Sequence, residues 1–186
     1  SAASAALLQA ENFVCEPIMI TETERLRDIL YLYPSIHTIV DGVPPIFEER
    51  DDTGTLGTQS VLSAVGARPI RIIYLSTTGV YGERNGAIVT ETTVPRPPEH
   101  HAAARLACEQ IYAERGSLTS ILRVAGIYGP RRSILDRLVR GEYRFVAGED
   151  RWTNRIHVED LATAITRLIS YKATNGEPPP RILNAS

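Results

Sequence analysis

Cysteine is scarce in this chain, and no cluster of metal ligands accompanies it. Cys15 and Cys108 are the only cysteines among 186 residues, and they form neither a CxxC motif nor a Cys/His cluster. A disulfide framework needs several paired cysteines, and a structural zinc site needs clustered thiolates or imidazoles. The sequence therefore predicts no disulfide framework and no metal site. It favours a reducing compartment, either the cytoplasm or the interior of an organelle.

Long apolar runs and an excess of one charge are missing as well. No run approaches the roughly 20 apolar residues that cross a bilayer, and the start, "SAASAALLQA", lacks the basic flank of a secretory signal. Lysine plus arginine number 20 against 22 acidic residues, a net charge of -2, so neither nucleic acid nor a membrane is expected as a partner. With 43% hydrophobic residues, we expect a single globular domain over residues 1–186.

Short apolar segments alternate with longer amphipathic ones along the chain, which is typical of a parallel α/β sheet. The expected strands are residues 13–20, 36–40, 71–77, 119–125, 143–147 and 181–185. The expected helices are residues 21–33, 57–67, 99–116, 132–141 and 157–173. The fold class is therefore α/β, with a parallel sheet flanked by helices.

Hydroxyl side chains gather where the strand 71–77 ends. Ser76, Thr77 and Thr78 stand together in the stretch "YLSTTGVYG", just before a turn-rich segment. Ligands of open α/β sheets bind beyond the carboxyl ends of the strands, so this pattern predicts a ligand site at that edge. A plainer interpretation is also open, in which Thr77 only caps the turn that follows it.

Several motifs are similar, in order and spacing, to those of a known family. They are "RIIYLSTTGVYG" (71–82), "AARLACEQ" (103–110), "ILRVAGIYGP" (121–130) and "NRIHVEDLA" (154–162). This series resembles the extended and atypical short-chain dehydrogenases/reductases, the NAD-dependent epimerase/dehydratase group. The resemblance implies a Rossmann-like sheet, NAD or NADP as cofactor, and hydride transfer at a carbonyl carbon of a small-molecule substrate. Nucleotide sugars are the commonest substrates of that family, and its long helix, here 99–116, often forms a homodimer.

The resemblance also implies catalytic positions. The family's hydroxyl residue corresponds to Thr77, and its Tyr-xxx-Lys pair corresponds to His101 and Arg105. The i, i+4 spacing keeps both side chains on one helix face, but an arginine does not release its proton as a tuned lysine does. His101 could move a proton near neutral pH, and Arg105 could hold ribose hydroxyls or a phosphate. His101 could equally be a solvated residue at the helix start, whereas the place of Arg105 four residues later favours cofactor contact over an ordinary surface position.

Further contacts follow from the same resemblance. The cofactor contacts that it implies are Gly42, Val43, Pro44, Ser76, Arg105, Ala125, Gly126 and Ile127. The substrate contacts that it implies are Tyr81, Arg131, Arg132 and Arg155. Arg131 and Arg132 could grip a phosphate or a carboxylate, or simply flank a helix start. Arg155 could line a substrate pocket or only pack against it. Trp152, the only tryptophan, could line a substrate pocket or pack against it.

One departure from the family pattern is large. The first glycine of the chain is Gly42, so no glycine-rich turn between a first strand and helix precedes it. We therefore expect a Rossmann-like domain truncated at its N-terminus. Two functions remain as alternatives: an NAD(P)-dependent oxidoreductase, epimerase or dehydratase, and a catalytically inactive protein that uses the fold for binding or scaffolding.

Overall fold

The computed structural model describes residues 14–49, 52–82, 84–130, 132–142, 152–171 and 177–186. The strand expected at 143–147 lies outside these residues, as does Arg131. In the described part, no helix is long and apolar enough to cross a membrane.

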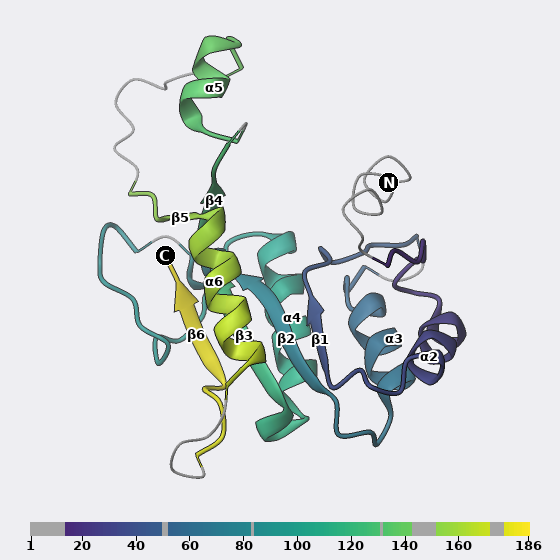
Figure 1. The fold of residues 1–186 in the computed structure, drawn as a ribbon. Coiled ribbons are helices and arrows are strands. Elements are labelled where there is room, and N and C mark those ends of the chain that lie inside the picture. The colour runs from purple at the N-terminus through teal and green to yellow at the C-terminus, as the bar shows by residue number, and fades with distance from the viewer. Residues whose placement is uncertain (1–13, 50–51, 83, 131, 143–151, 172–176) are drawn as a thin grey trace.

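The centre of the fold is a four-stranded parallel sheet (Figure 1). Its strands are β1 (Thr38–Asp41), β2 (Arg71–Thr77), β3 (Thr119–Val124) and β6 (Ile182–Ala185), in the order β1-β2-β3-β6. These four confirm the strands expected at 36–40, 71–77, 119–125 and 181–185. The strand expected at 13–20 is wrong, because residues 14–19 have no regular structure. Glu16 and Pro17 interrupt that apolar run, and a proline cannot donate to a strand ladder.

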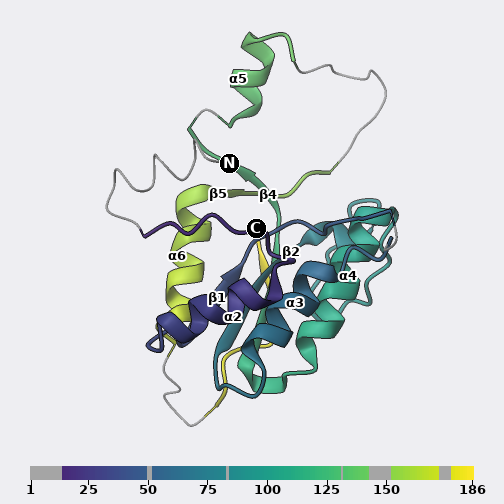
Figure 2. The same cartoon turned by 90° about the vertical axis from the view of Figure 1, so that its right-hand side faces the viewer.

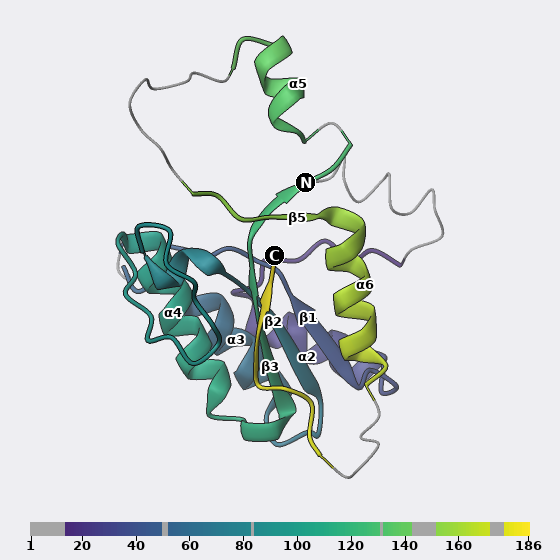
Figure 3. The same cartoon turned by 90° about the vertical axis from the view of Figure 1, so that its left-hand side faces the viewer.

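Helices cover both faces of the sheet. α3 (Leu56–Val65) and α4 (His100–Ala113) lie on one face, with α2 (Thr23–Leu32) packed on α3, and α6 (Val158–Ile169) covers the other (Figure 3). α5 (Ile134–Val139) projects away from this body (Figure 2). All five expected helices are thus present, each shorter than its expected range. Two single 3₁₀ turns, η1 (Thr78–Tyr81) and η2 (Gly116–Leu118), precede and follow α4.

Two apolar clusters hold these layers together, and β2 contributes side chains to both of them. Successive side chains of a strand point to opposite faces, so Ile72 packs towards α3 and α4 while Ile73 packs towards α6. Both isoleucines are fully buried. All of β3 is buried as well, as expected for a central strand of a sheet covered on both sides.

A second, two-stranded parallel sheet was not expected from the sequence. It joins β4 (Gly126–Tyr128) to β5 (Arg155–His157). Each strand has three residues, too few for an alternating pattern to stand out in the sequence. The pairing sets Gly126 opposite Arg155 and so brings the segment after β3 against the segment before α6.

Gly82 ends η1 in a backbone conformation that favours glycine, with φ of 72°. A Cβ at this position would collide with the carbonyl oxygen of Arg96, which belongs to a neighbouring segment. That segment is fixed there by the Arg96 N–H, which donates to the Val80 carbonyl at 2.9 Å. Gly82 therefore permits the backbone of Arg96 to pack closely against η1, just after β2.

We predict that Gly82→Ala destabilises the protein by at least about 2 kcal/mol, because positive φ and a backbone collision add to each other. The matched control is Gly116→Ala, where φ is 63° and nothing lies within 4 Å of the added methyl group. Urea unfolding of both variants checks this. Equal unfolding free energies for the two variants would contradict it.

Candidate active site

Thr77 stands at the carboxyl end of β2, where the sequence predicts a ligand site. Its Oγ1 accepts a hydrogen bond from the Gly79 N–H at 3.1 Å and so caps η1. The structure therefore confirms that Thr77 caps the turn that follows it. A hydroxyl that accepts one hydrogen bond still has its own hydrogen to donate. Thr77 is thus oriented by the turn and keeps a donor available at the sheet edge.

A buried ion pair lies directly beneath this edge. Glu109 of α4 and Arg123 of β3 are each 3% exposed, and the Arg123 Nη2 lies 2.7 Å from the Glu109 Oε2. The Arg123 Nε also donates to both carboxylate oxygens, at 3.1 and 3.2 Å, and the Ser76 hydroxyl donates to Oε1 at 2.5 Å. Burial opposes the charge of Arg123, but its hydrogen bonds with Glu109 and Tyr81 outweigh burial and raise its pKa.

The network continues through Tyr81 to the last strand of the sheet. The Tyr81 hydroxyl accepts from the Arg123 Nη1 at 2.9 Å and donates to the Asn184 Oδ1 at 2.8 Å. The Asn184 N–H in turn donates to the Glu91 carboxylate at 2.8 Å. This N–H holds the pKa of Glu91 below its usual range, so the link persists until the pH falls through that lowered value.

Arg105 joins α4 to the ends of two strands. Its Nη1 donates to the Leu75 carbonyl at 2.8 Å, and it also lies 3.3 Å from the Val43 carbonyl and 3.4 Å from the Tyr74 hydroxyl. The guanidinium therefore satisfies main-chain carbonyls at the carboxyl ends of β1 and β2. Burial raises the pKa of Tyr74, so its hydroxyl remains protonated at neutral pH.

His101 is exposed on the first turn of α4. Its contacts are with aromatic rings: Phe47 lies edge-on at 5.0 Å between centroids, and His100 lies at 6.1 Å. His100 also reaches the loop that carries Phe47, with its Nε2 2.9 Å from the Asp52 carbonyl. The structure describes no contact between His101 and Thr77, so a proton-transfer role for His101 stays a prediction.

The turn after β1 is held by a buried carboxylate that the sequence did not single out. Asp41 is 4% exposed, accepts from the Val43 N–H at 2.9 Å and accepts from the Tyr112 hydroxyl at 2.7 Å. Burial, with the neighbouring Asp41, raises the pKa of Tyr112 far above its ordinary value. Gly42, Val43 and Pro44 are exposed beyond this anchor, at the sheet edge where they were expected.

Some of the expected binding residues are engaged inside the protein, and several line a cavity. Ser76 and Ala125 are buried, with the Ser76 hydroxyl turned to Glu109 and the Ala125 N–H donating to Ala185 at 2.8 Å. Tyr81 is 2% exposed, and its hydroxyl is engaged inside the protein. Gly126, Ile127, Arg132 and Arg155 line one cavity, Tyr81 lines a second, and Val43 and Pro44 line others beside β1.

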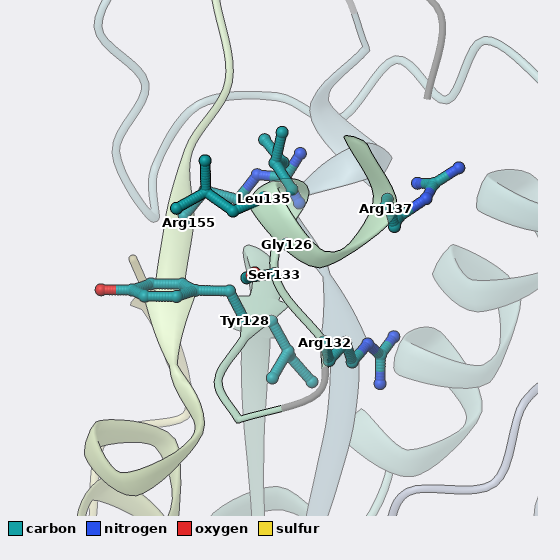
Figure 4. Close-up of a pocket in the computed structure, with 9 residues that line it drawn as sticks. Gly126, Tyr128, Arg132, Ser133, Leu135, Arg137 and Arg155 are labelled. Carbon is teal, nitrogen blue, oxygen red and sulfur yellow. The ribbon is translucent and has the colours of Figure 1, made fainter. Parts of the chain in front are cut away.

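A cavity of about 520 Å³ separates the small β4–β5 sheet from α5 (Figure 4). Three arginines line it: Arg155 from β5, Arg132 from the turn before α5, and Arg137 from α5 itself. No acidic residue is among the described residues that line it. The Arg155 side chain lies over Gly126, where an added Cβ would stand 2.9 Å from its Nη1. Several guanidinium groups around one cavity favour an anion such as a phosphate.

A second cavity, of about 460 Å³, lies over the end of β2. Its lining includes Thr78 and Tyr81 of η1, Gly86 of the following loop, and Trp152 and Asn154 before β5. Asn154 and Arg155 are neighbours in sequence but line different cavities. The two cavities therefore lie on either side of the start of β5.

Comparison with known proteins identifies the family. The sequence model of the NAD dependent epimerase/dehydratase family matches residues 42–185. A parallel sheet with a ligand edge at its carboxyl end is the architecture of dinucleotide-dependent enzymes, and this chain belongs to the NAD dependent epimerase/dehydratase family. The match confirms the resemblance drawn from the sequence motifs.

One curated relative is protein YeeZ of Escherichia coli strain K12. It is 33% identical over 114 residues, which cover 58% of this chain and 38% of YeeZ. The matched region thus spans well under half of that relative.

Solved structures agree on a Rossmann-like fold. A structure described as an NAD-dependent epimerase/dehydratase from Methylobacillus flagellatus has a TM-score of 0.73 and 26% identity, covering 97% of this chain and 69% of its own. UDP-glucose 4-epimerase from Thermotoga maritima, solved with UDP-glucose, has a TM-score of 0.71 and 22% identity, and the match covers 94% of this chain and 62% of the epimerase. dTDP-glucose 4,6-dehydratase from Bacillus anthracis, in complex with NAD, has a TM-score of 0.71 and 21% identity, and the match covers 90% of this chain and 56% of the dehydratase.

We predict that Glu109→Gln destabilises the protein by about 3–5 kcal/mol, because it leaves the Arg123 charge buried without its counter-charge. The control is Glu24→Gln, which breaks the exposed pair with Arg27 and should cost less than about 1 kcal/mol. Urea unfolding at neutral pH measures both. A change for Glu109→Gln no larger than that of the control would show that the buried pair is not essential.

Proposed function

We propose that this chain forms the substrate-binding part of an NAD(P)-dependent enzyme that epimerises or dehydrates a nucleotide sugar. The observation that carries the proposal is the cavity of about 520 Å³ lined by Arg132, Arg137 and Arg155. A diphosphate is a strong ligand for such a group of guanidiniums. The family membership and the two neighbours named as sugar-nucleotide enzymes support the same substrate class.

The described residues fit one end of a dinucleotide. The exposed turn at Gly42, Val43 and Pro44 and the hydroxyl of Thr77 lie at the carboxyl ends of β1 and β2, which suits the nicotinamide and its ribose. The sequence has no glycine before Gly42, so these residues do not form the glycine-rich cradle that holds a pyrophosphate. When bound, a nicotinamide supplies the acceptor and donor of a hydride.

Thr77 is the residue that we assign to the substrate oxygen. Its position is fixed by the Gly79 N–H, and its free hydrogen can be donated to an oxygen on which negative charge develops. Arg105 orders the same edge by binding the carbonyls of Val43 and Leu75. His101 is our candidate for moving the proton, since an imidazole titrates near neutral pH.

The alternative of an inactive scaffold has less support. The described edge keeps an oriented hydroxyl donor and a cationic cavity beside it, features that a purely structural protein does not need. The neighbouring structures are also named as enzymes. We therefore favour the catalytic alternative.

The test is calorimetric titration of the protein with UDP-glucose, dTDP-glucose and UDP. We expect at least one to bind, and we expect the double variant Arg132→Gln/Arg155→Gln to weaken it at least about tenfold, because each lost phosphate contact removes a charge-assisted hydrogen bond. Arg25→Gln, an exposed arginine on α2, is the control and should bind like the wild type. Absence of binding, or unchanged binding by the double variant, would refute the proposal.

Thr77→Val tests the chemistry separately. We expect it to lower kcat for the nucleotide sugar identified above by about 100-fold, the loss typical of removing one donor to a developing oxyanion. The KM for NAD or NADP should change little, since the hydroxyl is aimed at the substrate. Thr163→Val, an exposed position on α6, is the control. A higher KM for the cofactor with unchanged kcat would make Thr77 a cofactor-binding residue instead.

A further inference from the structure

The second cavity contains the only tryptophan of the protein in an unusual setting. Trp152 is 81% exposed, yet one side of its indole is covered by the backbone of Gly86. A Cβ built on Gly86 would meet three atoms of the five-membered ring, Nε1, Cδ1 and Cε2, at 2.6, 3.0 and 3.0 Å. Three similar distances indicate that the ring turns its flat face to Gly86. The exposed remainder of the indole is left for another ligand.

The loop under this indole is firmly anchored. Arg84 donates from Nε to the Tyr81 carbonyl at 2.8 Å and from Nη2 to the Val94 carbonyl at 2.7 Å. Gly86, with φ of 79°, follows in a conformation that favours glycine. A large aromatic surface therefore rests on a loop held in place, which lowers the entropy cost of stacking a ligand on it.

The lining beside the indole includes the Arg84 side chain, which is held by two carbonyls, and two neutral polar side chains. Thr78 and Asn154 line the same cavity, and neither side chain hydrogen-bonds to a residue that the structure describes. Ala87, Ile88 and Val89 contribute apolar surface, and Ile88 is 93% exposed. No acidic residue is among the described residues of this lining. This lining thus has one arginine, engaged with main-chain carbonyls, where the cavity beside α5 has three.

Neutral hydroxyl and amide groups beside an aromatic face match a polyhydroxylated ring. The apolar C–H face of a pyranose can stack on an indole, while its hydroxyls exchange hydrogen bonds with Thr78 and Asn154. An anion is less suited to this cavity, whose one arginine is engaged with carbonyls, than to the other, which three arginines line.

We infer that the cavity lined by Thr78, Gly86, Trp152 and Asn154 binds the sugar ring of the substrate, with Trp152 as its stacking platform. This inference rests on the proposed function, in which the arginine-lined cavity holds the diphosphate. Trp152 then decides which sugars are accepted, because its indole sets the height and tilt of the ring above η1. Thr78 adjoins Thr77, so a ring held here lies next to the residue assigned to the substrate oxygen.

Because Trp152 is the sole tryptophan, its fluorescence reports this cavity alone. Titration with methyl α-glucoside, which carries no phosphate, should change the emission of Trp152 with weak affinity, in the millimolar range. UDP-glucose should bind about tenfold more tightly than UDP by calorimetry, a difference that we call the sugar increment.

Three variants localise the effect. Trp152→Ala should abolish the sugar increment and leave UDP affinity unchanged, whereas Trp152→Phe should retain part of it. Gly86→Ala should also reduce the increment, because the new methyl group displaces the indole. Gly66→Ala is the matched control, with φ of 57° and nothing within 4 Å of the added methyl group, and it should bind like the wild type.

The outcomes separate the two proposals. Loss of UDP binding in the arginine variants together with an unaltered sugar increment in Trp152→Ala would overturn this inference and leave the proposed function intact. If UDP does not bind at all, the proposed function fails, and the methyl glucoside titration still decides the sugar subsite. No change in Trp152 emission with the glycoside would then overturn it.

Discussion

The carboxyl edge of the sheet depends on one buried ion pair, that of Glu109 and Arg123. It fastens α4 to β3, receives the hydroxyl of Ser76 from β2, and reaches β6 through Tyr81. Two charges out of water are stable only when hydrogen bonds satisfy them in a fixed geometry. The pair therefore fixes where β2 ends, and with it the position of Thr77 and the floor of the cavity above η1.

Much of this fold could be predicted from the sequence, and the exceptions have physical causes. β2 and α4 follow from hydrophobic periodicity, since their apolar residues face a continuous core. Residues 14–19 have a similar apolar content but form no strand, because Pro17 and Glu16 break the ladder. The three-residue strand β5 could not be predicted, because its pairing depends on tertiary contact with β4.

The candidate site was predictable to a lesser degree. Thr77 could be chosen because it ends a buried strand and matches the hydroxyl residue of the family pattern. Arg132 could be chosen because it stands at the start of an expected helix, and Arg155 because it stands in the loop before another. Glu109 and Arg123 were not singled out, although a charged residue amid the apolar run of β3 was a signal for a buried partner. The cavity beside Trp152 was beyond sequence reasoning, because it depends on the close approach of Gly86 to a residue far along the chain. The two cavities differ in their lining, one having three arginines and the other an exposed indole, and they lie on either side of the start of β5.

The most direct test of these two binding sites is a crystal structure of the protein grown with UDP-glucose. We expect the diphosphate to lie against Arg132 and Arg155 and the glucose ring over Trp152, with a sugar oxygen within hydrogen-bonding distance of Thr77. Electron density for the ligand elsewhere on the protein, or none at a saturating concentration, would contradict this expectation.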